Sequence, residues 1–489
     1  MKFADWYEVE KDAKVLIVEK NTETIEQYKN NKYDYIYLNG ILENANKFFE
    51  TTNPYFDLLV FFKGLLTEKG TLFIAVNNAK GVQYIAGKKS EHCKKIYDSL
   101  ENQFDKGKLF TKKELEKIIS ILGFENKKMY YPLPNYEIPN VIFTDNYLPD
   151  NSNSKLNYNV IYNEESLVIQ SEINLLKIMI SEEKFTEFTN SYIVELSNRQ
   201  INNNFKYYSF NNMRKDRYSL ILKMNDEYVI KTPQTKEALE HIKNINNIAN
   251  KLREKGFDIA EEGQQDIVKS KLIKYPQFDS YLMSLVEENK VEEVYKAIDN
   301  WYDYLQDKLK PDDKGFVKDG FIDMVFENTF YNKTENEYVF FDQEWYKENI
   351  PIKFIMYRAI KNLYAHNPKI ENVISEEKML NRYDIKNDEY QKQEGQIQEE
   401  IIDNDKREFY SKQYKCITKP EEIKQIIKDI KKLNKDNVEL IDGIKKLNEK
   451  IEQKDKLLQE QNLRIQQLEQ ETVRNKIVKT IKQKINKKG

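Results

Sequence analysis

Residues 321–328 read FIDMVFEN, and residues 340–344 read FFDQE. The first stretch places Asp323 and Asn328 five positions apart, and the second places Asp342 directly after a short apolar run. Carboxylate and amide oxygens are the ligands that Mg²⁺ prefers in proteins. The 19 residues from Asp323 to Asp342 leave room for a loop and a short hairpin, so we expect these three side chains to meet at one site.

A strand that ends in lysine lies upstream of these two motifs. Residues 228–231 read YVIK, and a helical pattern covers residues 236–254 directly afterwards. Phosphoryl transfer from ATP requires a lysine on the phosphates, a carboxylate that orients it, an aspartate facing the acceptor hydroxyl, and oxygen ligands for Mg²⁺. The sequence offers these groups in that order, with Glu237 or Glu240 as the expected partner of Lys231.

The segment before this strand contains no glycine. A hairpin that covers the nucleotide is expected around residues 208–222, where residues 211–217 read NNMRKDR. Glycine normally allows the backbone to approach a phosphate closely. Arg214 or Arg217 is expected to hold phosphate instead, and an exposed salt bridge is the alternative role for both.

Together these motifs resemble the protein-kinase-like fold of the aminoglycoside and lipopolysaccharide kinase type. More narrowly, residues 237–242, 323–330 and 340–345 look like the kinase-like half of bifunctional methyltransferase–kinase proteins from O-antigen and other surface-glycan loci. The roles that this resemblance implies are binding of ATP by Lys231 and Arg214, orientation of Lys231 by Glu237, an acceptor-facing base at Asp323, and Mg²⁺ ligation by Asn328 and Asp342, assisted by Glu344. An inactive domain of the same fold is the alternative.

The first 150 residues alternate short apolar runs with amphipathic stretches, as α/β units do. Three strands and one helix are expected at residues 14–18, 33–38, 71–76 and 114–122. The helix is followed by Gly123, at the position where glycine most often ends a helix. Between about residues 155 and 385 we expect strands at residues 218–223, 228–231 and 338–341. A long helix is expected at residues 290–309, in addition to the one at 236–254.

The first 150 residues resemble class I S-adenosylmethionine-dependent methyltransferases, and the likeness covers nearly all of residues 10–150. The stretches that carry the general likeness are residues 14–19, 33–43 and 65–75. A narrower similarity, to methyltransferases of bacterial surface-glycan clusters, rests on residues 77–87, 90–92, 110–115 and 130–136. The family implies a Rossmann-like sheet and S-adenosylmethionine as the cofactor.

The chain departs from that family where the cofactor binds. The family has a glycine turn after its first strand, but here the 20 residues from Lys14 to Asp34 contain no glycine. One βαβ unit takes about 30 residues, so at least one unit of the cofactor half is missing. We therefore expect a degenerate domain without methyl transfer. Glu91 and His92 are then either remnants of a substrate site or structural residues.

Composition narrows the class of protein. The 489 residues contain 78 Lys and Arg against 81 Asp and Glu, and this near-balance argues against a nucleic-acid binder. Two cysteines and three histidines exclude a disulfide framework and leave little for a His/Cys metal site. We find no signal-peptide pattern and no apolar run near the ~20 residues that span a bilayer, so we expect a cytoplasmic protein. Glycine is scarce, at 14 residues.

A heptad repeat begins near Glu421. Position a is occupied by Ile423, Ile430, Asn437, Ile444, Ile451, Leu458 and Ile465, and position d by Ile426, Leu433, Leu440, Leu447, Lys454, Gln461 and Leu468. Ile at a with Leu at d favours a parallel dimer, and one buried Asn such as Asn437 fixes its register. A higher oligomer and a single helix packed on its own domain are the alternatives.

The predicted fold is α/β for a truncated Rossmann-like domain (residues 1–150) and α+β for a kinase-like domain (155–385). A charged linker (386–420), a coiled coil (421–472) and a basic amphipathic tail (473–489) follow. The tail suits an anionic membrane surface, which would make the protein peripheral at the inner face of the cell membrane, and a frayed, soluble end of the coil is the alternative.

Two functional hypotheses remain open from the sequence. In the first, the protein phosphorylates a glycan or lipid-linked glycan with Mg·ATP in surface-polysaccharide biosynthesis. In the second, it is an inactive coiled-coil scaffold for the glycosyltransferases of the same pathway. Methyl transfer from S-adenosylmethionine is a third and weaker alternative.

Overall fold

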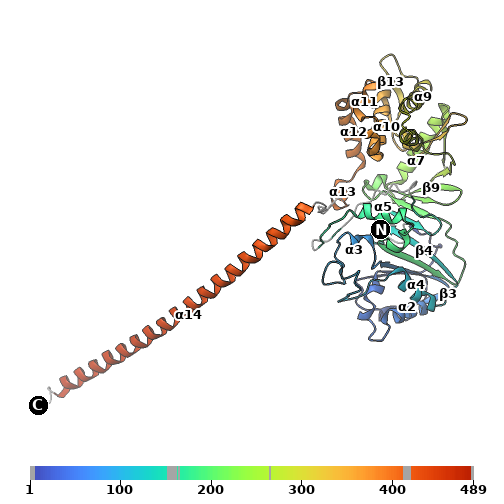
Figure 1. Ribbon diagram of the computed structural model, residues 1–489. Coiled ribbons are helices and arrows are strands. Elements are labelled where there is room, and N and C mark those ends of the chain that lie inside the picture. Colours follow the sequence, from blue (N-terminus) through green and yellow to red (C-terminus); the bar gives the residue numbers. More distant parts are fainter. Residues whose placement is uncertain (1–5, 151–161, 163–165, 264–265, 411–419, 486–489) are drawn as a thin grey trace. The chain divides into compact units, whose positions relative to one another are not determined.

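The computed structural model describes residues 6–150, 162, 166–263, 266–410 and 420–485. The chain divides into two compact units, Met1–Cys416 and Ile417–Gly489. A large mixed sheet runs through the first unit, and the described part of the second unit is one long helix (Figure 1).

The large sheet has eleven strands. In spatial order they are β1 (Val15–Glu19), β2 (Tyr33–Asn39), β3 (Leu66–Asn77), β6 (Ser191–Ser197), β4 (Asn126–Leu133), β5 (Val141–Thr144), β7 (Tyr207–Phe210), β8 (Leu220–Met224), β9 (Tyr228–Pro233), β12 (Val268–Lys271) and β11 (Glu261–Gly263).

The parallel part of the sheet consists of β1, β2 and β3, the three strands expected from the sequence. Val18 lies opposite Leu38, which lies opposite Ile74, and all three side chains are buried. Among the described residues no strand lies outside β1, so Val15 and Ile17 are 36% and 40% exposed. The chain passes from β1 to β2 through a single short 3₁₀ turn, which matches the predicted loss of chain after the first strand.

Strand β6 joins the sheet from beyond the expected domain boundary near residue 150. It runs antiparallel between β3 and β4, with Val194 opposite both Ile74 and Met129. Residues 191–197 therefore complete the first sheet rather than begin a second domain. The mixed α/β arrangement is consistent with the predicted Rossmann-like fold.

Helices pack on this part of the sheet through one apolar core. The longer ones are α2 (Pro54–Gly64), α4 (Lys112–Ile121) and α5 (Glu172–Ser181), and the shorter ones are η2 (Ile41–Lys47), α3 (Val82–Ile85) and α6 (Phe185–Phe188). Leu59, Leu115 and Leu176, from α2, α4 and α5, are fully buried. Helix α4 begins with a reciprocal hydrogen-bonded cap between Thr111 and Glu114, and Gly123 just beyond it has φ +66°, as expected.

The other end of the sheet is antiparallel and contains β7, β8, β9, β12 and β11. Lys231 of β9 lies opposite Leu222 on one side and Val268 on the other. Helix α7 (Leu239–Glu254) follows β9 and buries Ile242 and Ile245 against Val268. The strands and the helix predicted here are confirmed to within three residues at each end.

A helical core lies beyond β11 in the chain. It contains α8 (Phe278–Glu287), α9 (Val291–Leu309), α10 (Ile352–His366) and α11 (Glu376–Arg382). Trp301 of α9 is completely buried and contacts the ring of Phe326, with 4.8 Å between the ring centroids. The predicted helix over residues 290–309 is confirmed.

Two small sheets accompany this core. In one, β14 (Thr329–Asn332) and β15 (Glu337–Phe340) form an antiparallel hairpin, and β10 (Asp258–Ile259) pairs parallel with β15. In the other, β13 (Phe316–Phe321) pairs with β16 (Tyr346–Pro351). The β14–β15 hairpin separates Asn328 from Asp342, as the spacing of the two motifs predicts.

Residues expected to form a charged linker are partly folded into this core. Residues 387–410 contain helices α12 (Asn387–Ile401) and α13 (Asn404–Tyr410). Tyr390, Ile397 and Ile401 are at most 6% exposed and belong to the same apolar cluster as Trp301. The three apolar residues are spaced seven and four positions apart, so they share one face of α12, whereas the high overall charge obscured this pattern.

The described part of the second unit is helix α14 (Pro420–Ile485), whose 66 residues would extend for about 99 Å. Its apolar side chains are exposed, for example Leu440 at 64% and Ile444 at 50%. No described helix of the chain combines the length and the apolar character needed to cross a membrane.

Candidate functional site

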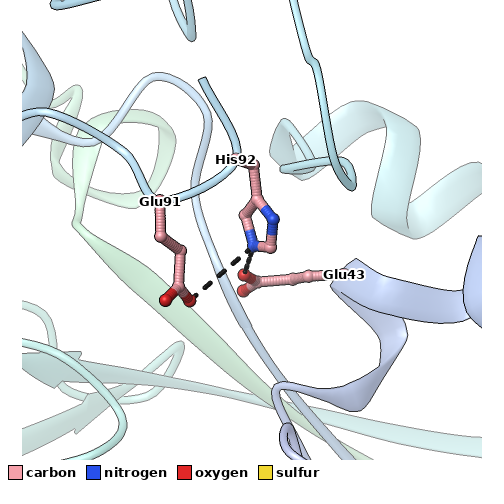
Figure 2. A group of neighbouring side chains, drawn as sticks. All are labelled: Glu43, Glu91 and His92. Carbon is pink, nitrogen blue, oxygen red and sulfur yellow. Dashed lines mark hydrogen bonds and ion pairs between the residues drawn. The ribbon is translucent and has the colours of Figure 1, made fainter. Parts of the chain in front are cut away.

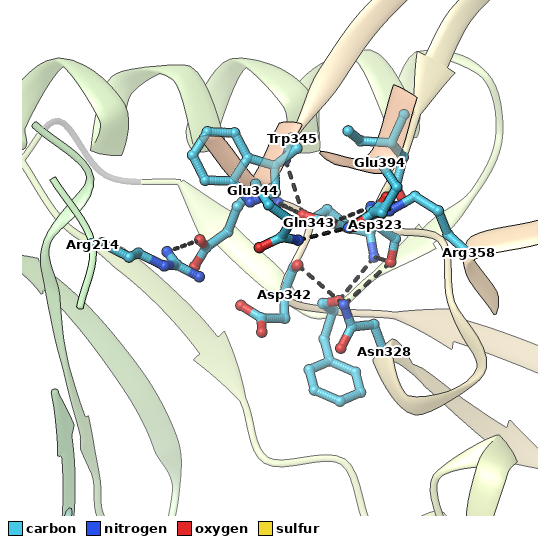
Figure 3. A network of polar contacts seen from close by, with 12 residues as sticks. Arg214, Asp323, Asn328, Asp342, Gln343, Glu344, Trp345, Arg358 and Glu394 are labelled. Carbon is cyan, nitrogen blue, oxygen red and sulfur yellow. Dashed lines mark hydrogen bonds and ion pairs between the residues drawn. The ribbon is translucent and has the colours of Figure 1, made fainter. Parts of the chain in front are cut away.

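The structure brings together residues from three separate parts of the sequence next to β9. Lys231 lies on β9, Asp342 and Glu344 follow the β14–β15 hairpin, and Arg214 lies between β7 and β8. Figure 3 shows Arg214, Asp342 and Glu344 within one polar network that also contains Asp323.

Lys231 is the cation at the centre of this network. Its side chain is buried, and Nζ donates to Asp342 Oδ1 and, at 2.7 Å, to Glu344 Oε1. Burial disfavours the charged ammonium, but the two carboxylates outweigh this and raise the pKa of Lys231 above its usual value. The lysine therefore remains charged and ties the sheet to the segment that follows β15.

Glu344 is the carboxylate that pairs with Lys231, a role that we predicted for Glu237. It is buried, and its second oxygen, Oε2, lies 2.5 Å from Arg214 Nη1 and 3.6 Å from His241 Nε2. Burial acts to raise the pKa of Glu344, yet the charges of Arg214 and Lys231 hold it well below its ordinary value. Because both oxygens of Glu344 contact cations, its carboxylate orients Lys231 rather than facing an open metal position.

The predicted partners of Lys231 on α7 lie elsewhere. Glu237 precedes the first residue of α7 and is exposed, and Glu240 is exposed and lies 3.8 Å from Lys243. The predicted pairing of Lys231 with Glu237 is therefore not formed. The register of α7 explains the difference, because this helix begins only at Leu239.

Asp323 is enclosed by hydrogen-bond donors (Figure 3). Its Oδ2 accepts from the backbone N–H groups of Glu344 and Trp345, both at 3.0 Å, and its Oδ1 lies 3.0 Å from Arg358 Nη1. Burial raises the pKa of Asp323 to about 6 even though Arg358 opposes this change. These contacts place Asp323 as the group that holds the Glu344–Trp345 backbone, which differs from the acceptor-facing role expected from the sequence.

Asn328 and Asp342 retain the features expected of metal ligands. The amide nitrogen of Asn328 donates to the carbonyl oxygens of Asp323 at 3.2 Å and Asp342 at 3.5 Å, so its own carbonyl oxygen is the atom suited to a cation. The side chain of Asp342 is 44% exposed and its φ is +58°, a left-handed conformation that aspartate tolerates better than most residues. Such conformations cluster at functional sites.

Glu261 belongs to this site, although the sequence did not reveal it. It lies on β11 with 1% exposure, and its Oε1 accepts from the backbone N–H of Asp342. Its Oε2 is buried without a hydrogen-bond partner among the described residues. Burial raises the pKa of Glu261 to about 7, against the attraction of Lys231. No motif marks this residue, since only the pairing of β11 with β12 brings it near Lys231.

A cleft of about 410 Å³ adjoins Lys231, Glu261 and Asp342. Its apolar walls are formed by Leu222, Met224 and Val229 from the sheet, by Ala260 just before β11, and by Phe330 and Phe341 from the hairpin region. The rings of Phe330 and Phe341 are stacked, with centroids 4.3 Å apart and planes inclined by 24°. The cleft is thus apolar on its walls and charged at one end.

The glycine-free loop between β7 and β8 contacts a segment far along the chain. The backbone N–H of Lys215 donates to Ile401 at 2.9 Å, and the N–H of Asp403 donates to Met213 at 3.0 Å. The side chain of Lys406 binds Asp216. Arg214 is turned to Glu344, and its guanidinium lies 5.8 Å from the ring centre of Trp345.

Comparisons with known proteins give little further information. No protein-family model and no curated protein sequence matches the chain. Among solved structures, a similarity is found to the crystal structure of a SAM-dependent methyltransferase from Archaeoglobus fulgidus, at 14% identity and a TM-score of 0.20. That match covers 35% of this chain and 63% of the other, and a likeness of this size defines neither a family nor an activity.

The enclosure of Asp323 predicts a large loss of stability when its carboxylate is removed. Asp323→Ala leaves Arg358 with Glu394 as its remaining carboxylate partner and leaves two backbone N–H groups without an acceptor. At about 1–3 kcal/mol for each unsatisfied buried donor, the free energy of unfolding should fall by about 2–5 kcal/mol. Denaturant unfolding followed by circular dichroism measures this change. Asp299→Ala is the control, because it removes a more exposed contact with Arg382 and should cost about 1 kcal/mol or less. Equal losses in the two variants would contradict the enclosed role.

The raised pKa of Glu261 predicts a pH-dependent stability. The folded protein holds the proton on Glu261 more tightly than the unfolded chain, so this stabilisation is complete below about pH 4.5 and is lost as the pH rises to about 7. Glu261→Gln stays neutral, and its stability relative to the wild type should increase across that window by up to about 3 kcal/mol. Glu262→Gln, on the exposed neighbour, should follow the wild-type curve, whereas an identical pH profile for Glu261→Gln and wild type would refute the assignment.

Proposed function

We propose that the cleft beside Lys231 binds Mg·ATP and that the protein transfers the γ-phosphate to a hydroxyl group of a glycan. The observation that carries this proposal is the meeting of a buried lysine and an accessible aspartate at the charged end of an apolar cleft, with Asn328 hydrogen-bonded to the backbone of that aspartate. These are among the group types that phosphoryl transfer requires, whereas Asp323, the base expected to face the acceptor hydroxyl, is enclosed by backbone N–H groups and Arg358.

The apolar walls suit the flat base of a nucleotide. A planar ring placed in the cleft would lie between the aliphatic side chains of Leu222, Met224 and Val229 and the stacked rings of Phe330 and Phe341. The volume of about 410 Å³ falls within the range of small-molecule sites. Lys231, Glu261 and Asp342 then lie at the end where the phosphates belong.

The polar groups at that end suit a bound cation and phosphates. Glu261 Oε2 lacks a partner among the described residues, and the side chain of Asp342 is 44% exposed. Asp342 and Asn328 would hold Mg²⁺, which neutralises phosphate charge when bound. Lys231 would exchange its contact with Asp342 for phosphate oxygens while Glu344 keeps it oriented. Asp323 holds the backbone of Glu344 and acts as a positioning residue.

The acceptor and pathway rest on the family resemblance of the sequence. The motifs around Lys231 and Asp342 resemble the kinase-like half of proteins from O-antigen loci, so we infer a glycan or lipid-linked glycan as the acceptor and glycosyltransferases of the same pathway as partners. The methyltransferase-like half is proposed to lack S-adenosylmethionine catalysis. Its support is the edge position of β1 and the glycine-free stretch from Lys14 to Asp34.

Nucleotide binding tests the proposal. Lys231→Met should weaken binding of a fluorescent ATP analogue with Mg²⁺ by at least tenfold, because the phosphates lose their cation. Lys223→Met is the matched control, since Lys223 is also buried but lies on β8 and pairs with Glu8 outside the cleft. Its affinity should stay within twofold of the wild type. A wild type that fails to bind Mg·ATP, or two variants with equal affinity, would contradict the proposal.

A scaffold function is the second candidate, and the loop between β7 and β8 favours it. This loop lacks glycine and is bound to residues 401–406, and the backbone amides of Arg214 and Lys215 donate to Asn211 and Ile401, so neither of these amides is free to cover a phosphate. In a scaffold the cleft would be a remnant, and α14 would display two inactive domains to glycan-assembly enzymes.

In both candidates α14 is proposed to pair with a second copy in a parallel coiled coil. Support comes from the heptad pattern together with the exposure of its a and d positions, such as Ile444 at 50% and Leu447 at 60%. An exposed apolar stripe along 66 residues is costly in water, and a second copy carries the complementary stripe in the same register. Asn437 would lie opposite its own copy and fix that register.

Sedimentation equilibrium of the full chain tests the dimer. Ile444→Asp places two like charges together at an a position and should weaken self-association at least tenfold. Val438→Asp introduces the same type of change at position b, which faces away from the seam, and should leave self-association within twofold of wild type. A monomeric wild type, or equal effects of the two variants, would contradict the coiled coil.

The end of α14 is proposed to contact an anionic membrane surface. Arg474, Lys476, Lys479 and Lys482 accompany the exposed apolar residues Val473, Ile477 and Ile481. Each basic residue near such a surface contributes about 1 kcal/mol. Residues 486–489, which complete the predicted tail, lie outside the described residues.

A further inference from the structure

A second group of functional side chains lies in the Rossmann-like part, at the end of the parallel strands. Glu43 belongs to η2, which directly follows β2, and Glu91 and His92 lie in the loop after α3. Figure 2 shows both carboxylates turned to the same ring nitrogen of His92. None of these residues takes part in the proposed phosphoryl transfer.

The three side chains present their ligand atoms to one point. His92 Nε2 lies 2.7 Å from Glu43 Oε2 and 3.8 Å from Glu91 Oε1, and one ligand atom from each residue lies within 4.8 Å of the other two. His92 and Glu43 are 3% and 1% exposed, whereas the side chain of Glu91 is 54% exposed. The group is therefore built into the core on one side and open to solvent on the other.

The surrounding chain fixes the two buried members. The other oxygen of Glu43, Oε1, accepts the backbone N–H of Asn77 at 2.5 Å, and the carbonyl oxygen of His92 accepts the N–H of Asp105 at 2.8 Å. A Cβ at Gly107 would come within 2.5 Å of His92 Nδ1 and of the Glu43 carbonyl oxygen. Glycine at this position thus lets the loop close against the histidine ring, in a chain that has few glycines.

A buried hydroxyl group without a hydrogen-bond partner among the described residues, that of Tyr136, lies in the same part of the fold. This residue is 4% exposed, and its hydroxyl group has no hydrogen-bond partner among the described residues. The hydroxyl lies against Gly40, which is hydrogen-bonded through its carbonyl oxygen to the backbone of Glu43. Burial, followed by the charges of Glu43, Glu137 and Glu91, raises the pKa of Tyr136, so its hydroxyl lies in the field of this same group of carboxylates.

A simple hydrogen bond between Glu43 and His92 does not account for the whole arrangement. That bond explains the 2.7 Å contact between Glu43 and His92. It does not explain why Glu91 Oε1, which also lies 3.4 Å from Lys20, is turned to the same nitrogen at 3.8 Å. A cation at the common point satisfies both carboxylates and the imidazole at once. An imidazole ligand favours transition metals over Mg²⁺ and Ca²⁺.

We propose that Glu43, Glu91 and His92 form a binding site for a divalent transition-metal ion such as Zn²⁺. Each residue would supply one ligand atom, with Nε2 as the histidine donor and the ring proton on Nδ1. Three protein ligands leave a further coordination position open on the solvent side, beside Glu91. The site occupies the end of β2, where a Rossmann-like sheet usually receives its ligand.

Zinc binding to the full chain tests this inference, with Glu91→Gln as the variant. Glu91 is exposed, so the variant keeps the buried core intact, and an unchanged thermal midpoint verifies the fold. Glu137→Gln is the matched control, because Glu91 and Glu137 both pair with Lys20, at 3.4 and 2.8 Å, and both are partly exposed. Competition of Zn²⁺ against a fluorescent chelator, in excess Mg²⁺, measures the affinity.

The wild type should bind one Zn²⁺ ion tightly, Glu91→Gln at least tenfold more weakly, and Glu137→Gln within twofold of wild type. Excess Mg²⁺ should not displace the Zn²⁺ ion. This result would distinguish the site from the proposed Mg²⁺ ligands Asn328 and Asp342. A wild type without a tight Zn²⁺ site would overturn the proposal, as would equal affinities in Glu91→Gln and wild type. The proposed ATP site is unaffected by either result.

Discussion

The buried ammonium group of Lys231 holds the charged end of the cleft together. It joins strand β9 to Asp342 and Glu344, which lie more than one hundred residues later in the chain. Arg214 completes the balance of charge on Glu344, and Asp323 holds the Glu344 backbone through two N–H groups. Because incompletely paired charges are costly inside a protein, each of these groups depends on the others, and removal of one leaves another buried with fewer partners.

The sequence predicted those parts of this site that depend on the order and spacing of motifs along the chain. Strand β9 was recognisable by its apolar run, and the spacing between Asp323 and Asp342 left room for a loop and a short hairpin. The partner of Lys231 was not predictable in the same way. Glu237 was nearest in sequence, but α7 begins too late to direct it inward, and Glu344 arrives through the turn after β15. Glu261 carries no sequence signal, since only strand pairing and burial bring it to the cleft.

The same distinction applies to the fold. The three parallel strands and the lost segment after β1 were readable from apolar runs and from the interval between Lys14 and Asp34. The insertion of β6 was not, because a strand that crosses an expected boundary is identified only by its partners β3 and β4. Glycine is informative in two places in this chain. The glycine-free loop between β7 and β8 is held by hydrogen bonds to residues 401–406. Gly107 lies where the chain packs closely against His92, and a side chain there would collide with the histidine ring.

A crystal structure of the protein with Mg²⁺ and a non-hydrolysable ATP analogue tests the central claim most directly. The account predicts the base between Val229 and the stacked rings of Phe330 and Phe341, the phosphates in contact with Lys231, and Mg²⁺ bound by Asp342 and Asn328. Lys231 should keep its contact with Glu344 and lose its contact with Asp342. An analogue bound elsewhere, or an empty cleft in which Lys231 and Asp342 remain paired, would contradict the account.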